Sequence, residues 1–408
     1  MKILYLSQYF PPEMGAPAAR VHELSREWAA LGHEVTVLTG FPHHPTGVVP
    51  KDYRGELIRR EIVDGIRVVR APVYTTPNRG RVRRSLSYAS FATSATLLGP
   101  LLTQRPDVLI ATSPQFLTGV AGLAVSALRR TPFVFEVRDL WPRSIVEVGA
   151  LAKDSALVRL LERIERTLYA RADHIVVVTE SSVDELAALK VPREKISVVK
   201  NGVDLNLFQP RPRAEARRAL GLPDGFIASY VGTHGLAHGL GTLLDAAKLA
   251  PTLHFILAGE GAEKAQLKAR AAHEGLRNVT FLDQRPRTEV AQLLAASDVC
   301  LVMLKDAPLF RTVIPSKIFE CMGAGRAIVT TVDGESRRIL EDAGAGIFTP
   351  PGDARALATL LGQLANQPDR LEALGQSGRA HAVAHDSRPA LARRYLALLE
   401  QVAARGKR

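Results

Sequence analysis

Short apolar runs alternate along this chain with segments of helical spacing. The runs begin near residues 3, 35, 108, 133, 175 and 196, and again near residues 228, 254, 279, 299 and 327. Between the first two, Val21, Leu24 and Trp28 recur with the period of a helix. Strands that alternate with helices are typical of a doubly wound parallel sheet, so we predict an α/β fold with two such series. A hairpin is expected over residues 61–70, around Asp64-Gly65.

An Asn-Gly turn at Asn201-Gly202 separates the two series, and residues 210–213 follow it as a proline-bearing linker. We therefore predict an N-terminal domain at residues 1–200 and a C-terminal domain at residues 201–385. The chain from about residue 386 to 408 is expected to form a helix that crosses back to the first domain. Two α/β halves of similar size imply a cleft between the domains.

Residues 313–329 carry the densest chemistry, reading V-I-P-S-K-I-F-E-C-M-G-A-G-R-A-I-V. Pro315 and Ser316 are expected to open a helix, because serine can cap free amides. Lys317 and Glu320 then share one face of it. A cation, a carboxylate and a positive helix end suit a nucleotide diphosphate, with Lys317 on phosphate and Glu320 on ribose hydroxyls. The alternative is a buried helix that carries an exposed Lys317–Glu320 salt bridge.

The amino-acid composition indicates a globular protein but does not indicate its function. The 408 residues are 46% hydrophobic and 23% charged, which is ordinary for a globular protein. Two cysteines, Cys300 and Cys321, give no disulfide framework, so a reducing, cytoplasmic setting is expected. The first residues lack the long apolar core of a signal peptide, and no apolar run is long enough to span a bilayer.

The net charge of +12 calls for anionic partners. The local concentration is Arg79, Arg81, Arg83 and Arg84, followed by a segment that includes Leu86 and other apolar residues. A basic cluster that leads into an amphipathic helix is typical of peripheral contact with an anionic membrane; a basic loop before a core helix is the alternative. No nucleic-acid-binding module is recognisable, so we expect no nucleic-acid partner.

Several candidate functional residues of the first half follow predicted strands. Gly15 lies in the loop after the first strand and would let a ligand approach the next helix. Arg138 and Asp139 follow the strand at residues 133–137, where parallel sheets build active sites; Asp139 could equally cap the next helix. His43-His44 invites a metal interpretation, but no ligand-spaced Cys, Asp or Glu lies nearby. An acceptor-facing loop is therefore preferred, and no metal site is expected.

The second half has matching loops. Residues 232–239 form a glycine-rich turn, G-T-H-G-L-A-H-G, that contains the candidates Gly232, Thr233 and His238. The next strand ends in Gly259-Glu260-Gly261, and the one after it in Asp283-Gln284-Arg285, which supply the further candidates Gly259, Gly261 and Arg285. Each loop alone is a weak signal.

Together these motifs resemble the large family of retaining glycosyltransferases of the group 1, family 4 type, which have the GT-B architecture of two facing Rossmann-like domains. The resemblance covers nearly the whole chain. It rests on residues 201–204, on residues 257–261 followed by 278–282, on Ser297-Asp298 and on residues 320–325. The motifs R-D-L-W-P, G-x-x-G-L-A-x-G-L and P-S-K-x-x-E are similar to a subgroup of bacterial surface-polysaccharide transferases.

The resemblance implies a nucleotide diphosphate sugar as donor, with a UDP-sugar favoured, bound mainly by the C-terminal domain without a metal or cofactor. By position, Glu320 would bind the ribose, Gly15 would lie beside the donor phosphates, and the loop that ends in Arg285 would meet the nucleobase. Two usual phosphate cations appear here as Thr233 and His238, and Lys317 would replace them.

Two further departures are Thr312, where the family usually has a first glutamate, and Arg138, where a histidine is frequent. Arg138 would contact phosphate or acceptor, Asp139 would orient a hydroxyl, and His238, if protonated, would assist Lys317 in stabilising the leaving diphosphate.

The expected activity is a hexosyl- or N-acetylaminosugar transferase that retains the anomeric configuration. Its acceptor would be a lipid-linked or growing glycan in cell-surface polysaccharide synthesis, at the inner face of the cell membrane. Three alternatives stay open: a nucleotide-sugar epimerase, a hydrolase on the same fold, and a catalytically silent basic binding protein. A nicotinamide-dependent dehydrogenase is disfavoured because neither half has the full dinucleotide fingerprint.

Overall fold

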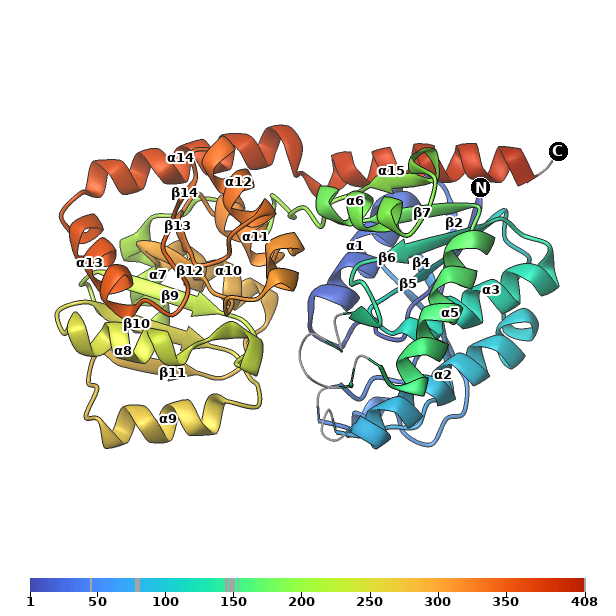
Figure 1. Cartoon of the computed structure of the whole chain (residues 1–408), viewed down its shortest axis with the longest axis horizontal. Coiled ribbons are helices and arrows are strands. Elements are labelled where there is room, and N and C mark those ends of the chain that lie inside the picture. Colours follow the sequence, from blue (N-terminus) through green and yellow to red (C-terminus); the bar gives the residue numbers. More distant parts are fainter. Residues whose placement is uncertain (45, 78–80, 144–145, 147–150, 153, 407–408) are drawn as a thin grey trace. The chain divides into compact units, whose positions relative to one another are not determined.

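The structure is a computed structural model that describes the chain except residues 45, 78–80, 144–145, 147–150, 153 and 407–408. The chain divides into two compact units (Figure 1). Unit 1 comprises Met1–Lys200 with Pro389–Arg408, and unit 2 comprises Asn201–Arg388. The sequence prediction has the same first boundary, and it has the return to the first unit at about residue 386 instead of Pro389.

Unit 1 is built on an eight-stranded sheet in the order β3-β4-β2-β1-β5-β6-β7-β8. Its strands are β1 (Lys2–Leu6), β2 (Glu34–Gly40), β3 (Arg59–Val63), β4 (Ile66–Ala71), β5 (Val108–Thr112), β6 (Phe133–Val137), β7 (His174–Val177) and β8 (Ile196–Val198). All neighbours pair in parallel except β3 and β4. These two form the predicted hairpin, whose turn residues Asp64 and Gly65 both have positive φ, at 50° and 80°.

Helices cover both faces of this sheet: α1 (Ala16–Ala30), α2 (Arg81–Leu102), α3 (Phe116–Arg129), α5 (Ala156–Arg171), α6 (Glu180–Ala188) and α15 (Arg388–Gly406). Successive strand residues enter opposite cores, because side chains alternate along a strand. In β1, for example, Leu4 and Leu6 join the core under α2 and α3, whereas Ile3 and Tyr5 join the core under α1 and α15. Burial on both faces explains why the strands are continuously apolar.

The last helix, α15, is part of unit 1 (Figure 1). The indole Nε1 of Trp28 on α1 donates a hydrogen bond to the Ala392 carbonyl at 2.9 Å. The Tyr395 ring lies edge-on to Trp28, with 5.4 Å between the ring centroids. Tyr395 and Leu399 are fully buried. The C-terminal helix therefore completes the core on the α1 face.

Unit 2 has a six-stranded, fully parallel sheet in the order β11-β10-β9-β12-β13-β14. The strands are β9 (Ile227–Val231), β10 (His254–Ala258), β11 (Val279–Leu282), β12 (Val299–Val302), β13 (Ala327–Thr330) and β14 (Gly346–Phe348). The helices are α7 (Arg213–Leu220), α8 (Gly241–Leu249), α9 (Lys264–His273), α10 (Arg287–Ala296), α11 (Lys317–Gly323), α12 (Glu335–Asp342), α13 (Ala354–Ala365) and α14 (Pro368–His385).

Both units are thus Rossmann-like, as the alternation of strands and helices predicts. The short strand β14 and the helix α12 before it were not predicted. Both have few apolar residues: β14 has three residues, and α12 contains several charged side chains. A periodic apolar signal is therefore weak there.

Candidate functional site

The carboxyl end of β9 is the centre of a group of nitrogen-bearing side chains in unit 2. Nζ of Lys317 lies 3.8 Å from the centroid of the Tyr230 ring. The rings of His234 and His238 lie 6.0 and 6.1 Å from the same ring. The Tyr230 hydroxyl donates to the carbonyl of Thr233 at 2.8 Å, which fixes the turn that carries both histidines. Tyr230, His234, His238 and Lys317 are called the basic cluster below.

The predicted glycines allow the strand ends to pack closely beside the basic cluster. Gly232 has φ of 149°, and a Cβ there would lie 2.6 Å from Nζ of Lys317. A Cβ on Gly259 would lie 1.9 Å from the Gly232 carbonyl oxygen, and one on Gly261 would lie 2.3 Å from the carbonyl oxygen of His234. A Cβ on Gly259 or Gly261 would collide with backbone atoms, whereas one on Gly232 would displace the Lys317 side chain and strain a backbone conformation that favours glycine.

Lys317 is the first residue of α11, and its ammonium group is buried. In the part of the chain that the structure describes, Nζ has no hydrogen-bond partner. Burial lowers the pKa of Lys317 to about 8, and Cys321 and Glu320 oppose that shift. The lysine is therefore still mainly protonated at pH 7. The alternative of an exposed Lys317–Glu320 salt bridge is wrong, because Glu320 Oε1 accepts from Nη2 of Arg287, at 3.5 Å.

The two histidines of the basic cluster are neutral at pH 7. His234 is fully buried, and neither ring nitrogen has a partner among the described residues. Burial, with a smaller contribution from Lys264, lowers its pKa to about 4. Nδ1 of His238 donates to the Gly235 carbonyl at 3.2 Å, and burial followed by Lys317 lowers its pKa to about 4. The expectation that His238 supplies a positive charge therefore fails for the protein without ligand.

The start of α11 differs from the prediction in one detail. Ser316 is the residue before the helix, but its side chain makes no capping hydrogen bond, so the predicted serine cap is wrong. The carbonyl of Pro315 accepts from the Ile318 amide at 3.0 Å and closes the first turn. On the same helix, burial raises the pKa of Glu320, and Arg287 opposes the rise.

Two other predicted residues lie apart from the basic cluster's side-chain contacts. Thr233 is exposed and contributes its carbonyl, rather than its hydroxyl, to the turn. Arg285 forms an ion pair with Glu289 at 3.2 Å, where both side chains are substantially exposed. Its predicted role near a nucleobase stays a prediction.

The predicted residues of unit 1 lie at the carboxyl edge of its own sheet. Gly15 precedes α1 with φ of 144°, a conformation that favours glycine. The amides of Arg138 and Asp139 both donate to Ser113 Oγ, at 2.7 and 3.3 Å. Asp139 is exposed, whereas Nε and Nη1 of Arg138 are buried and lack partners in the described part of the chain. The alternative prediction, that Asp139 caps the next helix, falls partly on residues 144–145 and 147–150, outside the described residues.

A buried ion pair lies next to Arg138. Nε and Nη2 of Arg20 donate to Glu136 Oε2 at 3.1 and 2.9 Å. The hydroxyls of Tyr5 and Thr112 both donate to Oε1 at 2.8 Å. The pKa of Glu136 is lowered: burial alone would raise it, but Arg20 and these hydrogen bonds outweigh burial. This carboxylate is therefore fully neutralised by its own unit.

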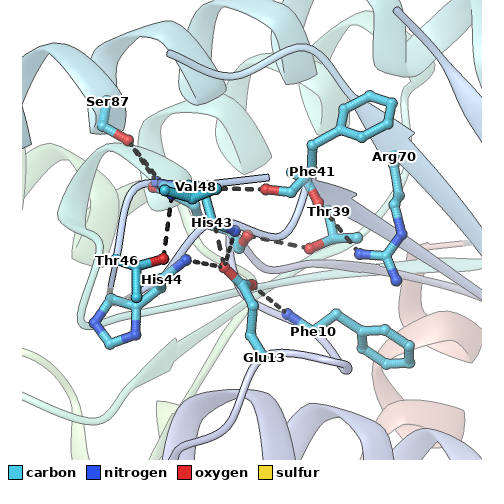
Figure 2. A network of polar contacts seen from close by, with 12 residues as sticks. Phe10, Glu13, Thr39, Phe41, His43, His44, Thr46, Val48, Arg70 and Ser87 are labelled. Carbon is cyan, nitrogen blue, oxygen red and sulfur yellow. Dashed lines mark hydrogen bonds and ion pairs between the residues drawn. The ribbon is translucent and has the colours of Figure 1, made fainter. Parts of the chain in front are cut away.

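A second carboxylate, Glu13, holds the loop that contains the two adjacent histidines (Figure 2). Oε1 accepts from the backbone amides of His43 and His44, at 3.0 and 2.9 Å. Nδ1 of His43 donates to the Phe41 carbonyl at 2.9 Å, and the hydroxyl of Ser87 donates to its Nε2 at 3.4 Å. Among the described residues, no three His, Cys, Asp or Glu side chains group as metal ligands. His43 has a structural role in this loop.

The sequence interpretation missed three residues of these sites: Glu13, Tyr230 and His234. Glu13 follows a Pro-Pro pair, and Tyr230 looks like any buried aromatic residue of a strand. His234 alone had a usable signal, because it lies in the same glycine-rich turn as the predicted His238.

The predicted membrane-contact segment is described in part. Arg79 lies outside the described residues, and Arg81 begins α2 although its side chain is not described. Arg83 and Arg84 are exposed. On the same helix Phe91 is fully buried in the core, whereas several apolar side chains are exposed: Val82 (73%), Leu86 (53%), Leu97 (65%) and Leu101 (78%). No helix within the described ranges combines the length and apolar character needed to cross a bilayer.

Two family profiles match consecutive parts of the chain. The glycosyl transferase 4-like domain matches residues 15–202, and the glycosyl transferases group 1 domain matches residues 212–381. Together they cover most of units 1 and 2.

Two curated relatives are glycosyltransferases by name, and one of them is assigned to colanic acid biosynthesis. One is the putative colanic acid biosynthesis glycosyl transferase WcaI of Escherichia coli K12, 28% identical over 82% of this chain and 84% of the relative. The other is the probable glycosyltransferase WbjE of Pseudomonas aeruginosa, 30% identical over 64% of this chain and 66% of the relative.

Solved structures match the fold over nearly the full length. Sucrose-phosphate synthase from Thermosynechococcus elongatus has a TM-score of 0.74 at 21% identity and covers 99% of both chains. HepE of Anabaena, solved with UDP and glucose, has a TM-score of 0.73 at 20% identity and covers 98% of this chain and 99% of HepE. The predicted fold class is confirmed, and the chain belongs to the GT-B glycosyltransferases that combine a glycosyl transferase 4-like domain with a glycosyl transferases group 1 domain.

Proposed function

We propose that this glycosyltransferase moves a sugar from a nucleotide diphosphate sugar, with a UDP-sugar favoured, to a lipid-linked or growing glycan during cell-surface polysaccharide synthesis. The name of WcaI supports the polysaccharide role, because that relative is assigned to colanic acid biosynthesis. The complexes of HepE with UDP and with UDP-glucose support a UDP-sugar donor. No cofactor or metal ion is invoked in this proposal.

The single observation that carries the proposal is the buried ammonium of Lys317 beside Gly232, which has no hydrogen-bond partner in the described part of the chain. Cleavage of a sugar–phosphate bond develops negative charge on the leaving diphosphate, and a fixed cation and backbone amides stabilise that charge. Glu320, on the same helix, would accept hydrogen bonds from the ribose hydroxyls. In this account Lys317 performs the electrostatic work that a metal ion does in other transferases.

For the transfer step we propose retention of the anomeric configuration, in which the leaving phosphate takes the proton of the acceptor hydroxyl on the same face of the sugar. Arg138 has two buried guanidinium nitrogens without partners among the described residues, and it would contact phosphate or acceptor. Asp139, which is exposed at the same sheet edge, would orient the acceptor hydroxyl. Product configuration, read by NMR of the new glycosidic bond, tests retention directly; an inverted linkage would contradict this mechanism.

The donor site is tested by calorimetry with UDP, GDP and dTDP in the presence of EDTA. We expect micromolar binding of one nucleotide, and loss of that binding in Glu320→Ala and Lys317→Met. Lys248→Met serves as the matched control, since Lys248 is exposed and pairs with Glu274 on the surface of unit 2. If no nucleotide binds, the proposed donor site is wrong. Turnover of the bound sugar nucleotide without any acceptor would instead favour a hydrolase or epimerase.

We also propose that the exposed face of α2 contacts the inner face of an anionic membrane. Arg83 and Arg84 would attract acidic headgroups, and Val82 and Leu86 would insert beside them. The vesicle partition coefficient, measured by co-sedimentation with vesicles that contain phosphatidylglycerol, should fall by about thirtyfold or more for Arg83→Glu with Arg84→Glu, since each arginine removed from the surface contributes about 1 kcal/mol or more. Equal co-sedimentation of wild type and variant would contradict membrane contact through α2.

A further inference from the structure

The basic cluster contains three nitrogen-bearing side chains that can hold a proton, and it contains no carboxylate. Lys317 and His234 lack hydrogen-bond partners in the described part of the chain, and His238 bonds only a backbone carbonyl through Nδ1. The carboxylates nearby have other partners. Glu260 binds Lys264 at 2.6 Å, and Glu320 lies 3.5 Å from Arg287. The cluster is therefore a buried set of nitrogen bases that no carboxylate of unit 2 neutralises.

The groups on every element around the histidines explain why the rings are neutral. From α11, Lys317 repels a proton on either ring. From α9, Lys264 also repels a proton on His234, while Glu260 attracts one. Asp283, after β11, accepts from Lys264 at 2.6 Å and shares that charge with Glu260. Tyr230 from β9 and Phe281 from β11 add aromatic surface that excludes water.

We propose that the His234–His238 pair takes up a proton when a nucleoside diphosphate binds beside Lys317. Binding of the donor would then create a second cation that the free protein does not have. This inference rests on the proposed donor site, and it assigns to that site a proton acceptor that the family comparison does not supply.

The tautomer of His238 makes it suited to this step. Its Nδ1–H donates to the Gly235 carbonyl, so Nε2 carries the lone pair in the neutral ring. A proton can therefore add at Nε2 without loss of the existing bond, and the new N–H can donate to a phosphate oxygen. Neither ring nitrogen of His234 has a hydrogen-bond partner of good geometry among the described residues, and the nearby Ala258 carbonyl favours a protonated ring. The diphosphate supplies the negative charge that the protein lacks here.

If the donor complex takes up a proton, the affinity for the donor should fall as the pH rises. A complex that gains one proton loses affinity by about tenfold for each pH unit of increase, over the range in which the free ring is neutral and the bound ring is charged. UDP-glucose has no phosphate proton that titrates in this range. Lys317 contributes little below pH 7, because the pKa of about 8 keeps it mainly protonated in the free protein.

The test is calorimetric titration of UDP-glucose at pH 6.5, with EDTA, in two buffers of different ionisation enthalpy. The wild type is expected to take up about one proton for each UDP-glucose bound. His234→Phe with His238→Gln should bind more weakly, without uptake and without the pH slope. His254→Gln is the matched control: this histidine also has a pKa lowered by burial, but it binds Thr280 at the other end of β10. It should keep the full uptake.

Three outcomes would overturn the inference. Binding without proton uptake in the wild type would leave the donor site standing and remove the histidine role. Undiminished uptake in the double variant would assign the proton to another group, such as Glu320. Failure to bind UDP-glucose, GDP-mannose and dTDP-glucose alike would refute the proposed function and this inference with it. If the double variant does not fold, the ring ¹⁵N shifts of His234 and His238 in the wild type, with and without UDP-glucose, report protonation directly.

Discussion

Two buried charges at the carboxyl edges of the sheets, Glu136 in unit 1 and Lys317 in unit 2, have opposite surroundings. In unit 1, Glu136 is neutralised by Arg20 and by two hydroxyl groups. In unit 2, the ammonium of Lys317 is buried on an aromatic ring with no carboxylate partner in the described residues. A neutralised set stabilises the fold only if it stays complete. An unpartnered buried charge costs stability and indicates a function, here the binding of an anion.

The largest expected effect lies in the neutralised set of unit 1. Arg20→Met leaves Glu136 buried without its cation, and it removes the donors to the Val199 and Lys200 carbonyls. The free energy of unfolding should fall by about 3–5 kcal/mol, measured by urea denaturation. As a control, Arg67→Met removes an exposed ion pair with Glu34 and should cost less than about 1 kcal/mol. Similar small losses in both variants would contradict the assignment of Arg20 as a buried structural cation.

Removal of the Lys317 ammonium in unit 2 should lower the activity and leave the stability of the fold intact. Lys317→Met is expected to lower kcat/KM on the order of 10²-fold, because one fixed donor to the leaving diphosphate is lost. The melting temperature should stay the same or rise, since a buried charge is replaced by an apolar side chain. An unfolded Lys317→Met variant, or one with full activity, would remove the contrast between the units.

Glu13 is a buried carboxylate of unit 1 whose ionisation should lower the stability of the folded protein. Burial raises its pKa to about 7, although the amides of His43 and His44 and Arg70 oppose the rise. The folded state therefore binds the proton more tightly than the unfolded chain does, so this contribution to stability is present below pH 4.5 and is lost as pH rises through about 7.

When the pH is raised from 5 to 8, the free energy of unfolding of the wild type should thus fall by about 2 kcal/mol relative to that of Glu13→Gln, because the glutamine side chain does not titrate. Parallel urea denaturation series at both pH values measure this difference. Identical pH dependence of the two proteins would mean that Glu13 is not protonated in the folded state.

The smallest effect is expected at Glu320. Glu320→Gln keeps the shape of the side chain but removes the charge that strengthens hydrogen bonds to ribose hydroxyls, so the Kd for the bound sugar nucleotide should rise about tenfold. Glu341→Gln, which alters an exposed partner of Arg337, should leave Kd unchanged. Equal affinity in both variants would argue that Glu320 does not touch the nucleotide.

The sequence predicts the fold well because its signals are local. Apolar runs and helical spacing specify most strands and helices of both units, and Asp64-Gly65 specifies the antiparallel hairpin of β3 and β4. Glycines could be marked as candidates because they end apolar runs, and three of them lie against the basic cluster. These inferences need only neighbouring residues.

The chemistry of the sites depends on distant pairs, which a single sequence does not reveal. Glu320 meets Arg287 across 33 positions, and Arg20 meets Glu136 across 116 positions. The neutral state of His238 follows from burial and from Lys317, neither of which can be read from the turn itself. The capping role predicted for Ser316 is wrong because its backbone is helical, with φ of −57° and ψ of −26°, whereas a capping residue usually has an extended backbone.

A crystal structure with the sugar nucleotide that binds most tightly tests the central claim most directly. We expect the diphosphate to lie beside the glycine-rich turn, with a phosphate oxygen within about 3 Å of Lys317 Nζ. A phosphate oxygen should also contact His238 Nε2. A nucleotide bound elsewhere, with Lys317 still seated on Tyr230 and no phosphate beside it, would contradict the claim that the unpartnered charge of unit 2 is a donor site.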